Sequence, residues 1–144
     1  MADAIKSPDR GWTLLFATWL VVTGASLGSL FFSEVMELPP CSLCWYQRIF
    51  MFPLPIILLA GLFPFDAKVV RFALPVAGCG LAFATYHTLL HVGIIPESAA
   101  PCQQGVSCTD TYLDLFGFVS IPMLSLLAFS IVVALLVTLK RTAK

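Results

Sequence analysis

Four long stretches of this chain contain no charged side chain. They cover residues 12–32, 49–65, 72–96 and 115–139, and the second extends back to residue 39 with Arg48 as its only charge. A helix needs about 20 apolar residues to cross the hydrocarbon core of a bilayer. Lipid cannot hydrogen-bond the backbone, and the alternating pattern of a small barrel is absent, so each stretch must be helical. The sequence therefore predicts an all-α integral membrane four-helix bundle.

The predicted spans form a single domain of 144 residues, at about 12–32, 43–65, 72–95 and 119–139. Hydrophobic residues make up 59% of the chain and charged residues 11%, whereas a soluble domain has about 25% charged residues. This composition excludes an ordinary soluble protein and a disordered chain. The eight basic and eight acidic side chains cancel, so the charge offers no footprint for a nucleic acid.

The first predicted span has an alternative interpretation as a cleaved signal peptide. Its small residues, among them Gly24, Ala25 and Ser26, could form a processing site. The apolar run is longer than the core of a typical signal peptide, and small residues in a membrane helix allow neighbouring helices to approach closely. We therefore favour a retained membrane helix.

The basic residues predict which side of the membrane each end faces. Seven of the eight precede the first span, separate the second from the third, or follow the fourth: Lys6, Arg10, Lys68, Arg71, Lys140, Arg141 and Lys144. The loops at 33–40 and 93–114 carry acidic residues and no basic one. Because cytoplasmic loops retain Lys and Arg, both termini are expected in the cytoplasm and both acidic loops outside.

Four of the five cysteines form two closely spaced pairs. Cys41 and Cys44 make a CxxC motif where the second span begins, and Cys102 and Cys108 make a Cx5C motif in the second outer loop. Both pairs are predicted on the outer side, where disulfides form and persist. The fifth cysteine, Cys79, lies in the middle of the third span, where we expect a buried thiol that acts as a small apolar residue.

Three interpretations of the paired cysteines are open. A structural staple gains little from a CxxC, because a disulfide stabilises more when it closes a longer loop. A zinc site of four thiolates is sterically possible, but such sites belong mainly to reducing compartments, and no metal is expected. A redox switch fits best, because residues i and i+3 of a helix lie about 5 to 6 Å apart. The two prolines before the motif place both cysteines in the first turn of a helix, where a lowered thiol pKa is expected.

Arg48, the eighth basic residue, lies four residues after Cys44 and therefore on the same helix face. An arginine at mid-membrane costs about 2.5 to 3.5 kcal/mol and needs a reason to be retained. It could snorkel to lipid phosphates, or it could stabilise a Cys44 thiolate and an anion formed beside it. Electrons from a dithiol at this position need an acceptor, and a lipid-soluble quinone is a small molecule already dissolved in the membrane.

His87 and His91 are one turn apart in the outer half of the third span. They share a helix face and could hydrogen-bond a quinone oxygen or relay protons. The alternatives are a hydrogen bond to a Ser or Thr of another helix, and a metal or haem ligand. Trp45 and Tyr46 are expected to be interfacial anchors first and pocket walls second.

The run from Pro40 to Arg48, PCSLCWYQR, resembles the signature of the DsbB/BdbC family of thiol-quinone oxidoreductases. The resemblance covers nearly the whole chain: four spans, the CxxC entering the second, an arginine four residues on, and a cysteine pair between the third and fourth. It implies an enzyme of the bacterial cell (inner) membrane whose active cysteines lie outside. Such an enzyme reoxidises a secreted thioredoxin-like CxxC donor similar to DsbA and passes two electrons to ubiquinone or menaquinone. The Cx5C spacing is closer to the BdbC type than to the larger DsbB proteins.

The resemblance also implies an order of events. The reduced partner attacks the disulfide of Cys102 and Cys108 at Cys102. Cys108 then attacks Cys41, or the partner resolves first and the reduced pair exchanges with the CxxC afterwards. Either route releases Cys44 as a thiolate that reduces the quinone beside Arg48. A stable structural disulfide lies about 180 mV below a strongly oxidising donor, or about 8 kcal/mol for two electrons, so the loop disulfide is expected to be exposed and labile.

Two other functions remain open on the sequence alone. A quinone or vitamin K epoxide reductase uses a similar bundle and cysteine relay, but in that family the CxxC lies near the end of a late span rather than at the start of the second. A non-catalytic membrane subunit or transporter with disulfide-stapled outer loops is the alternative from another class. Thiol trapping separates a structural pair from a relay, because a structural pair stays oxidised when quinone is removed and a relay accumulates reduced.

Overall fold

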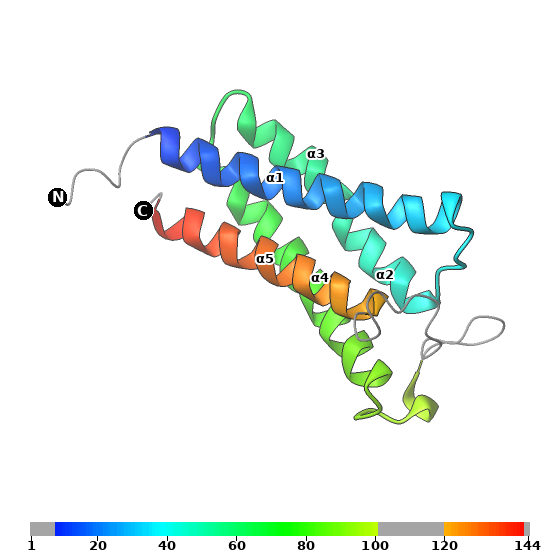
Figure 1. The fold of residues 1–144 in the computed structure, drawn as a ribbon. Helices are drawn as coiled ribbons and strands as arrows, with labels where there is room; N and C mark the ends of the chain where they lie inside the picture. Colours follow the sequence, from blue (N-terminus) through cyan, green and yellow to red (C-terminus); the bar gives the residue numbers. More distant parts are fainter. Residues whose placement is uncertain (1–7, 101–119, 143–144) are drawn as a thin grey trace.

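The computed structural model describes residues 8–100 and 120–142. Its α-helices are α1 (Pro8–Leu30), α2 (Ser42–Met51), α3 (Pro53–Leu62), α4 (Val70–His91) and α5 (Ile121–Thr142). Short turns of other helix types are η2 (Phe31–Val35), η3 (Ala67–Val69) and η4 (Glu97–Ala99), and the described residues contain no strand (Figure 1). Four segments of this part of the chain are long and apolar enough to cross a membrane: Arg10–Val35, Ser42–Leu62, Ala67–His91 and Ile121–Thr142. The prediction of an all-α four-helix membrane bundle is confirmed.

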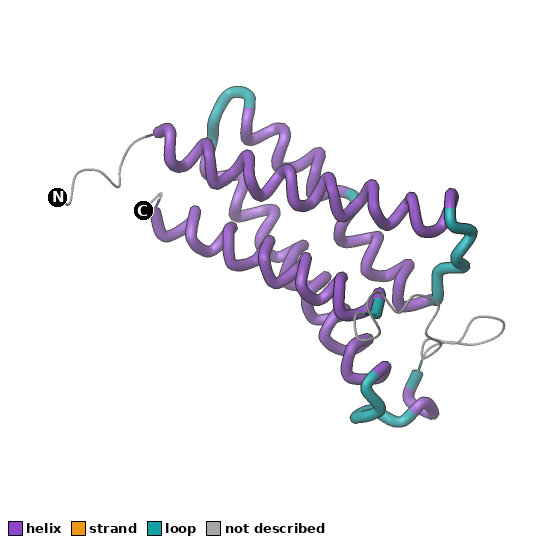
Figure 2. The backbone as a smooth tube through the Cα atoms, viewed as in Figure 1, coloured by secondary structure: helices purple, strands orange, loops and turns teal. Residues whose placement is uncertain are grey.

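The second membrane segment consists of two helices, a feature that the hydropathy pattern did not predict. Helix α2 ends at Met51 and α3 begins at Pro53, with Phe52 between them. Proline has no N–H group and its ring crowds the carbonyl four residues earlier, so Pro53 interrupts the helical hydrogen bonds. Phe52 keeps helical dihedral angles of −66° and −34°, and its N–H donates to the Arg48 carbonyl at 2.9 Å. The two helices therefore follow one another along a single course (Figure 2).

The helices lie side by side in a bundle. Helix α1 packs against α3 and α5, and α4 packs against α2, α3 and α5. The start of α1, the turn between α3 and α4, and the end of α5 lie at one end (Figure 1). The connection between α1 and α2 and the end of α4 lie at the opposite end, which also carries the start of α2 (Figures 1 and 2). We call this second end the site end.

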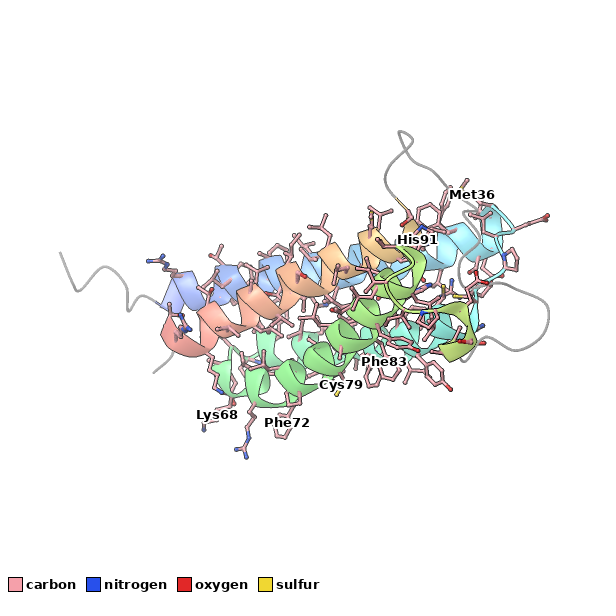
Figure 3. All side chains as sticks on the ribbon, turned by 90° about the horizontal axis from the view of Figure 1, so that it is seen from below. Met36, Lys68, Phe72, Cys79, Phe83 and His91 are labelled. Carbon is pink, nitrogen blue, oxygen red and sulfur yellow. The ribbon has the colours of Figure 1, made fainter. Side chains whose placement is uncertain are left out.

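Apolar side chains fill the bundle and also cover its outside. The buried core includes Leu15, Val22, Leu54, Leu58, Ala73, Ala77, Phe129, Val132 and Leu136. Gly80 allows α4 to approach α5 closely, because a Cβ atom at this position would clash with the Phe129 ring. Large apolar residues such as Ile56 and Phe72 are exposed on the outer surface, where a membrane helix meets lipid. Figure 3 shows Phe72 pointing away from the bundle. This distribution fits a bundle whose solvent is the bilayer.

Cys79 is exposed on the outer face of α4 and points away from the bundle (Figure 3). The prediction of a buried thiol is therefore wrong. The buried face of α4 follows Ala73, Ala77, Gly80 and Ala84, which are spaced three or four residues apart. Cys79 lies off this stripe and faces the surroundings of the bundle instead.

Candidate active site

A cavity of about 270 Å³ lies at the site end between α1, α2, α4 and α5. Most of its wall is apolar and includes Ala25, Phe32, Met51 and Phe129. Its polar lining consists of Ser29, Ser33, Cys41, Cys44, Gln47, Arg48, His87 and Ser125. The cavity thus brings together the CxxC motif, the arginine and one of the two histidines that the sequence singled out.

Cys41 caps the N-terminus of α2. Its backbone is extended, and its Sγ accepts a hydrogen bond from the Cys44 backbone N–H at 3.3 Å. This bond satisfies one of the amide groups that the first turn of a helix leaves unpaired. Cys44 lies in that first turn as predicted, whereas Cys41 precedes it, because its own backbone is extended and the helix begins at Ser42. The two Sγ atoms are 2.7 Å apart, so little movement separates the dithiol from the disulfide.

The surroundings of Cys41 favour its thiolate. A hydrogen bond from the Cys44 thiol is the largest of the causes that lower the pKa of Cys41 below its ordinary value. Burial raises this pKa, while His87 and the Cys44 backbone N–H lower it further. Cys41 also lies at the positive end of the α2 dipole. Its surroundings therefore favour the ionised form of Cys41 over that of an ordinary cysteine.

Arg48 is only 9% exposed, and helix α1 holds its guanidinium group. Its Nε donates to the Ser29 hydroxyl and its Nη2 donates to the Ser29 carbonyl, both at 2.8 Å. The guanidinium carbon lies 5.2 Å from the centre of the Trp45 ring. An arginine held in this way is directed into the bundle, so the structure does not support the snorkelling alternative. Its positive charge borders the same cavity as Cys44.

The two histidines have different surroundings. His87 is 2% exposed, with Nδ1 2.9 Å from Gln47 Nε2 and Nε2 3.8 Å from Cys41 Sγ. His91 lies one turn further, in the last turn of α4 (Figure 3), and does not line the cavity. Its Nδ1 is buried and has no hydrogen-bond partner among the described residues. Of the two histidines, the structure therefore brings His87 to the CxxC motif, and Gln47 is one of its hydrogen-bond partners there.

Three residues of this site were not singled out from the sequence. Ser29 anchors Arg48, Gln47 bonds His87, and Ser125 donates its hydroxyl to Gln47 Oε1. Gln47 gave a signal that could have been used, because an amide in an apolar span needs a buried partner. The two serines gave none, since a serine in a helix can bond its own backbone.

Trp45 and Tyr46 are largely exposed and do not line the cavity, consistent with anchors rather than pocket walls. Tyr46 stacks on Phe83 of α4, with ring centres 5.4 Å apart.

Cys102 and Cys108 lie outside the described residues. The ligand atoms of Cys41, Cys44 and His87 lie within 4.8 Å of one another, which is also close enough to hold a soft metal ion.

Known proteins with the same pattern are disulfide formation proteins. The family model for disulfide bond formation protein DsbB matches residues 10–139. A probable disulfide formation protein of Metapseudomonas resinovorans is 47% identical over 131 residues, which cover 90% of this chain and 91% of that protein. Disulfide bond formation protein C of Bacillus subtilis is 41% identical over 126 residues, covering 88% and 91%. Probable disulfide formation protein C 2 of Bacillus cereus is 48% identical over 118 residues, covering 82% and 84%. No solved structure matches the chain.

Proposed function

This chain belongs to the DsbB family of disulfide bond formation proteins, and we propose that it couples oxidation of a secreted thiol partner to reduction of a membrane quinone. Its membership and its four apolar segments make it a multi-pass membrane protein with a protein-disulfide oxidoreductase role. One observation carries the quinone proposal. The Cys41 and Cys44 pair borders a largely apolar cavity that also contains the buried charge of Arg48.

The residues of the cavity fit the ring of a quinone. The volume of about 270 Å³ is slightly below the range for sites that hold drug-sized ligands, about 300–1,000 Å³, and suits a ring of smaller size. A guanidinium has five N–H donors, and Arg48 directs two nitrogens at Ser29, so further N–H groups remain for a quinone oxygen. His87 lines the cavity and is a second candidate contact, whereas His91 does not line it. A bound ubiquinone or menaquinone supplies an acceptor for two electrons and two protons.

The CxxC pair and Arg48 carry the proposed exchange. The thiolate of Cys108 attacks Cys41 Sγ, the bond between Cys41 and Cys44 breaks, and its electron pair stays on Cys44. Arg48 stabilises this anion and the negative charge that develops beside it. The second loop cysteine, Cys102, then displaces Cys41, which leaves both CxxC sulfurs reduced. Re-forming the CxxC disulfide releases two electrons and two protons, which pass to the quinone.

The proposed partner is a thioredoxin-like CxxC donor similar to DsbA, which exchanges with the loop cysteines. The arrangement of the bundle supports an outer position for this exchange. The segments that carry most of the basic residues, at the start of α1, between α3 and α4, and at the end of α5, share the end opposite the site end (Figure 1). By the rule that cytoplasmic segments retain Lys and Arg, we place both termini in the cytoplasm and the active cysteines outside the bacterial cell (inner) membrane.

Purified protein, a reduced CxxC partner and a soluble quinone test this function. The unaltered protein is expected to reduce the quinone, and Cys44→Ser is expected to lose this activity because the CxxC disulfide can no longer form. Cys79→Ser is the matched control, since its thiol lies on the outer face of α4. Unchanged quinone reduction by Cys44→Ser would contradict the proposed electron route.

A further inference from the structure

Three side chains from three helices form a directed hydrogen-bond chain that ends on Cys41. Ser125 of α5 donates its hydroxyl to Gln47 Oε1 of α2. The Gln47 amide nitrogen faces His87 Nδ1 of α4 at 2.9 Å. On the other side of the imidazole ring, His87 Nε2 lies 3.8 Å from Cys41 Sγ, within reach of an N–H donor to sulfur.

This chain sets the tautomer of a neutral His87. Because the Ser125 hydroxyl occupies the amide oxygen, the amide nitrogen of Gln47 is the group that meets the ring, and an NH₂ group only donates. Nδ1 therefore accepts, and the ring proton lies on Nε2. Gln47 is 6% exposed and His87 is 2% exposed, so water does not readily replace either bond. The Nε2–H group is thus held in the direction of the Cys41 sulfur.

We propose that His87 donates its Nε2–H to Cys41 Sγ and stabilises the Cys41 thiolate when this sulfur is displaced from a mixed disulfide, with Gln47 and Ser125 as positioning residues. This role rests on the proposed function for the exchange step. In that step a thiolate attacks the other sulfur of the mixed disulfide, a new disulfide forms, the bond to Cys41 breaks, and its electron pair stays on Cys41. His87 keeps its proton and supplies a hydrogen bond, so the step needs no further reactant.

Among residues 8–100 and 120–142, few other charged or titratable groups surround this sulfur. Among the residues that line the cavity they are Cys44 and Arg48, both of α2. Tyr86 of α4 packs nearby, and its hydroxyl donates to the Ala99 carbonyl. Helices α1 and α5 contribute serines to the lining and no titratable group. An effect of Gln47 on the ionisation of Cys41 is therefore expected to pass through His87.

The first test measures ionisation of Cys41 in the full-length protein with this residue as its only cysteine. The background substitutions are Cys44→Ala, Cys79→Ala, Cys102→Ser and Cys108→Ser. The pH dependence of alkylation by iodoacetamide gives the midpoint at which Cys41 ionises. His87→Ala is expected to raise this midpoint by about one pH unit, a tenfold loss of thiolate below it, and Gln47→Leu to raise it by less.

Thr85→Ala is the matched control, because Thr85 is exposed on the same helix and its hydroxyl bonds the Leu81 carbonyl. A midpoint in His87→Ala equal to that of the control overturns the inference. An unchanged midpoint in Gln47→Leu overturns the positioning role of Gln47.

The second test needs no change at the hydrogen-bond chain itself. ¹⁵N NMR of histidine-labelled protein shows which ring nitrogen carries the proton, and a His91→Gln variant identifies the signals of His87. Protonation of Nε2 is expected, and protonation of Nδ1 overturns the inference. Neither test contains a partner or a quinone. Failure of the proposed function would appear as absent quinone reduction, whereas failure of this inference would appear as an unshifted midpoint or the other tautomer.

Discussion

Arg48 of α2 is joined to Ser29 of α1 by two hydrogen bonds that its guanidinium group donates, each 2.8 Å long. The bonds reach both the hydroxyl and the carbonyl of the serine. Because Arg48 is nearly buried, the position of its charge depends on this anchor rather than on water. The charge that borders the cavity is therefore set by a residue of the first helix.

Ser29→Ala removes the hydroxyl acceptor and leaves the carbonyl in place. We expect the KM for quinone to rise about tenfold, equivalent to about 1.4 kcal/mol, because the bond lost is one to a charged group. Steady-state quinone reduction with a saturating reduced partner measures the change. Ser26→Ala is the control, since that hydroxyl bonds the Val22 carbonyl of its own helix. Equal KM values in the two variants would show that Ser29 does not position the charge.

Arg48→Ala removes the positive charge together with its two hydrogen bonds to Ser29. We expect kcat/KM for quinone to fall by about 100-fold, which is typical for loss of a group that stabilises developing negative charge. Arg48→Lys keeps the charge but lacks the planar guanidinium group that bonds Ser29 twice. Its kcat/KM should therefore lie between those of the unaltered protein and Arg48→Ala. The same quinone assay ranks the three proteins. Full activity of Arg48→Ala would mean that the charge has no part in quinone reduction.

The lowered pKa of Cys41 predicts that this thiol stays reactive in acid. An ordinary cysteine has a pKa of about 8.5, so its thiolate fraction falls about tenfold for each pH unit below that value. In the reduced protein Cys41 should stay ionised at pH values below about 8.5, where an ordinary cysteine is protonated. It should lose reactivity only when the pH falls through its own lowered pKa. Cys44→Ala removes the hydrogen bond that is the largest cause of the lowered pKa of Cys41. The pH midpoint of Cys41 alkylation should therefore move upward in this variant. Mass spectrometry of the Cys41 peptide after iodoacetamide treatment measures both midpoints, and identical values would show that the Cys44 thiol does not lower the pKa of Cys41.

Hydropathy predicts the membrane helices because a span has a minimum length that composition must meet. The same signal does not report an interruption of the backbone, so the break at Pro53 was not predicted: the apolar run continues through it. Cys79 was predicted on the wrong face for a related reason. In a membrane bundle the lipid-facing and core-facing sides of a helix are both apolar, so periodicity does not identify the buried side.

Part of the site could be predicted because the cysteine pair has a recognisable spacing and because the charge of Arg48 conflicts with an apolar span. The partners of these residues could not, because they come from other helices. Ser29 and Ser125 act across the bundle, and nothing local distinguishes them from serines that bond their own helix. His87 and His91 were paired by their spacing, but one further turn carries His91 beyond the residues that line the cavity.

Gly80→Ala tests the close approach of α4 and α5. The added methyl group would meet the Phe129 ring, and such overpacking is expected to cost about 1–3 kcal/mol and to lower the Tm. Gly78→Ala is the control, because a Cβ atom there has no neighbour within 4 Å. Adding Phe129→Leu to Gly80→Ala should recover part of the loss. Thermal unfolding followed by circular dichroism in detergent measures each Tm, and equal values for the two alanine variants would contradict the close contact.

Cys102 and Cys108 are predicted to form a labile disulfide that takes part in the exchange. A structural disulfide has a potential below about −300 mV and could not oxidise a donor near about −120 mV. When quinone is withheld, electrons from the reduced partner have no outlet, so both cysteine pairs should accumulate as thiols. Cys44→Ser should accumulate the reduced loop pair even with quinone present.

Trapping with a mass-tagged maleimide counts the free thiols in each state, and Cys79→Ser removes the one thiol outside the two pairs. If the loop pair stayed oxidised in both conditions while the partner remained reduced, it would be a structural staple. The electron route through Cys108 to Cys41 would then be wrong, because no reduced sulfur would be available to attack the CxxC disulfide.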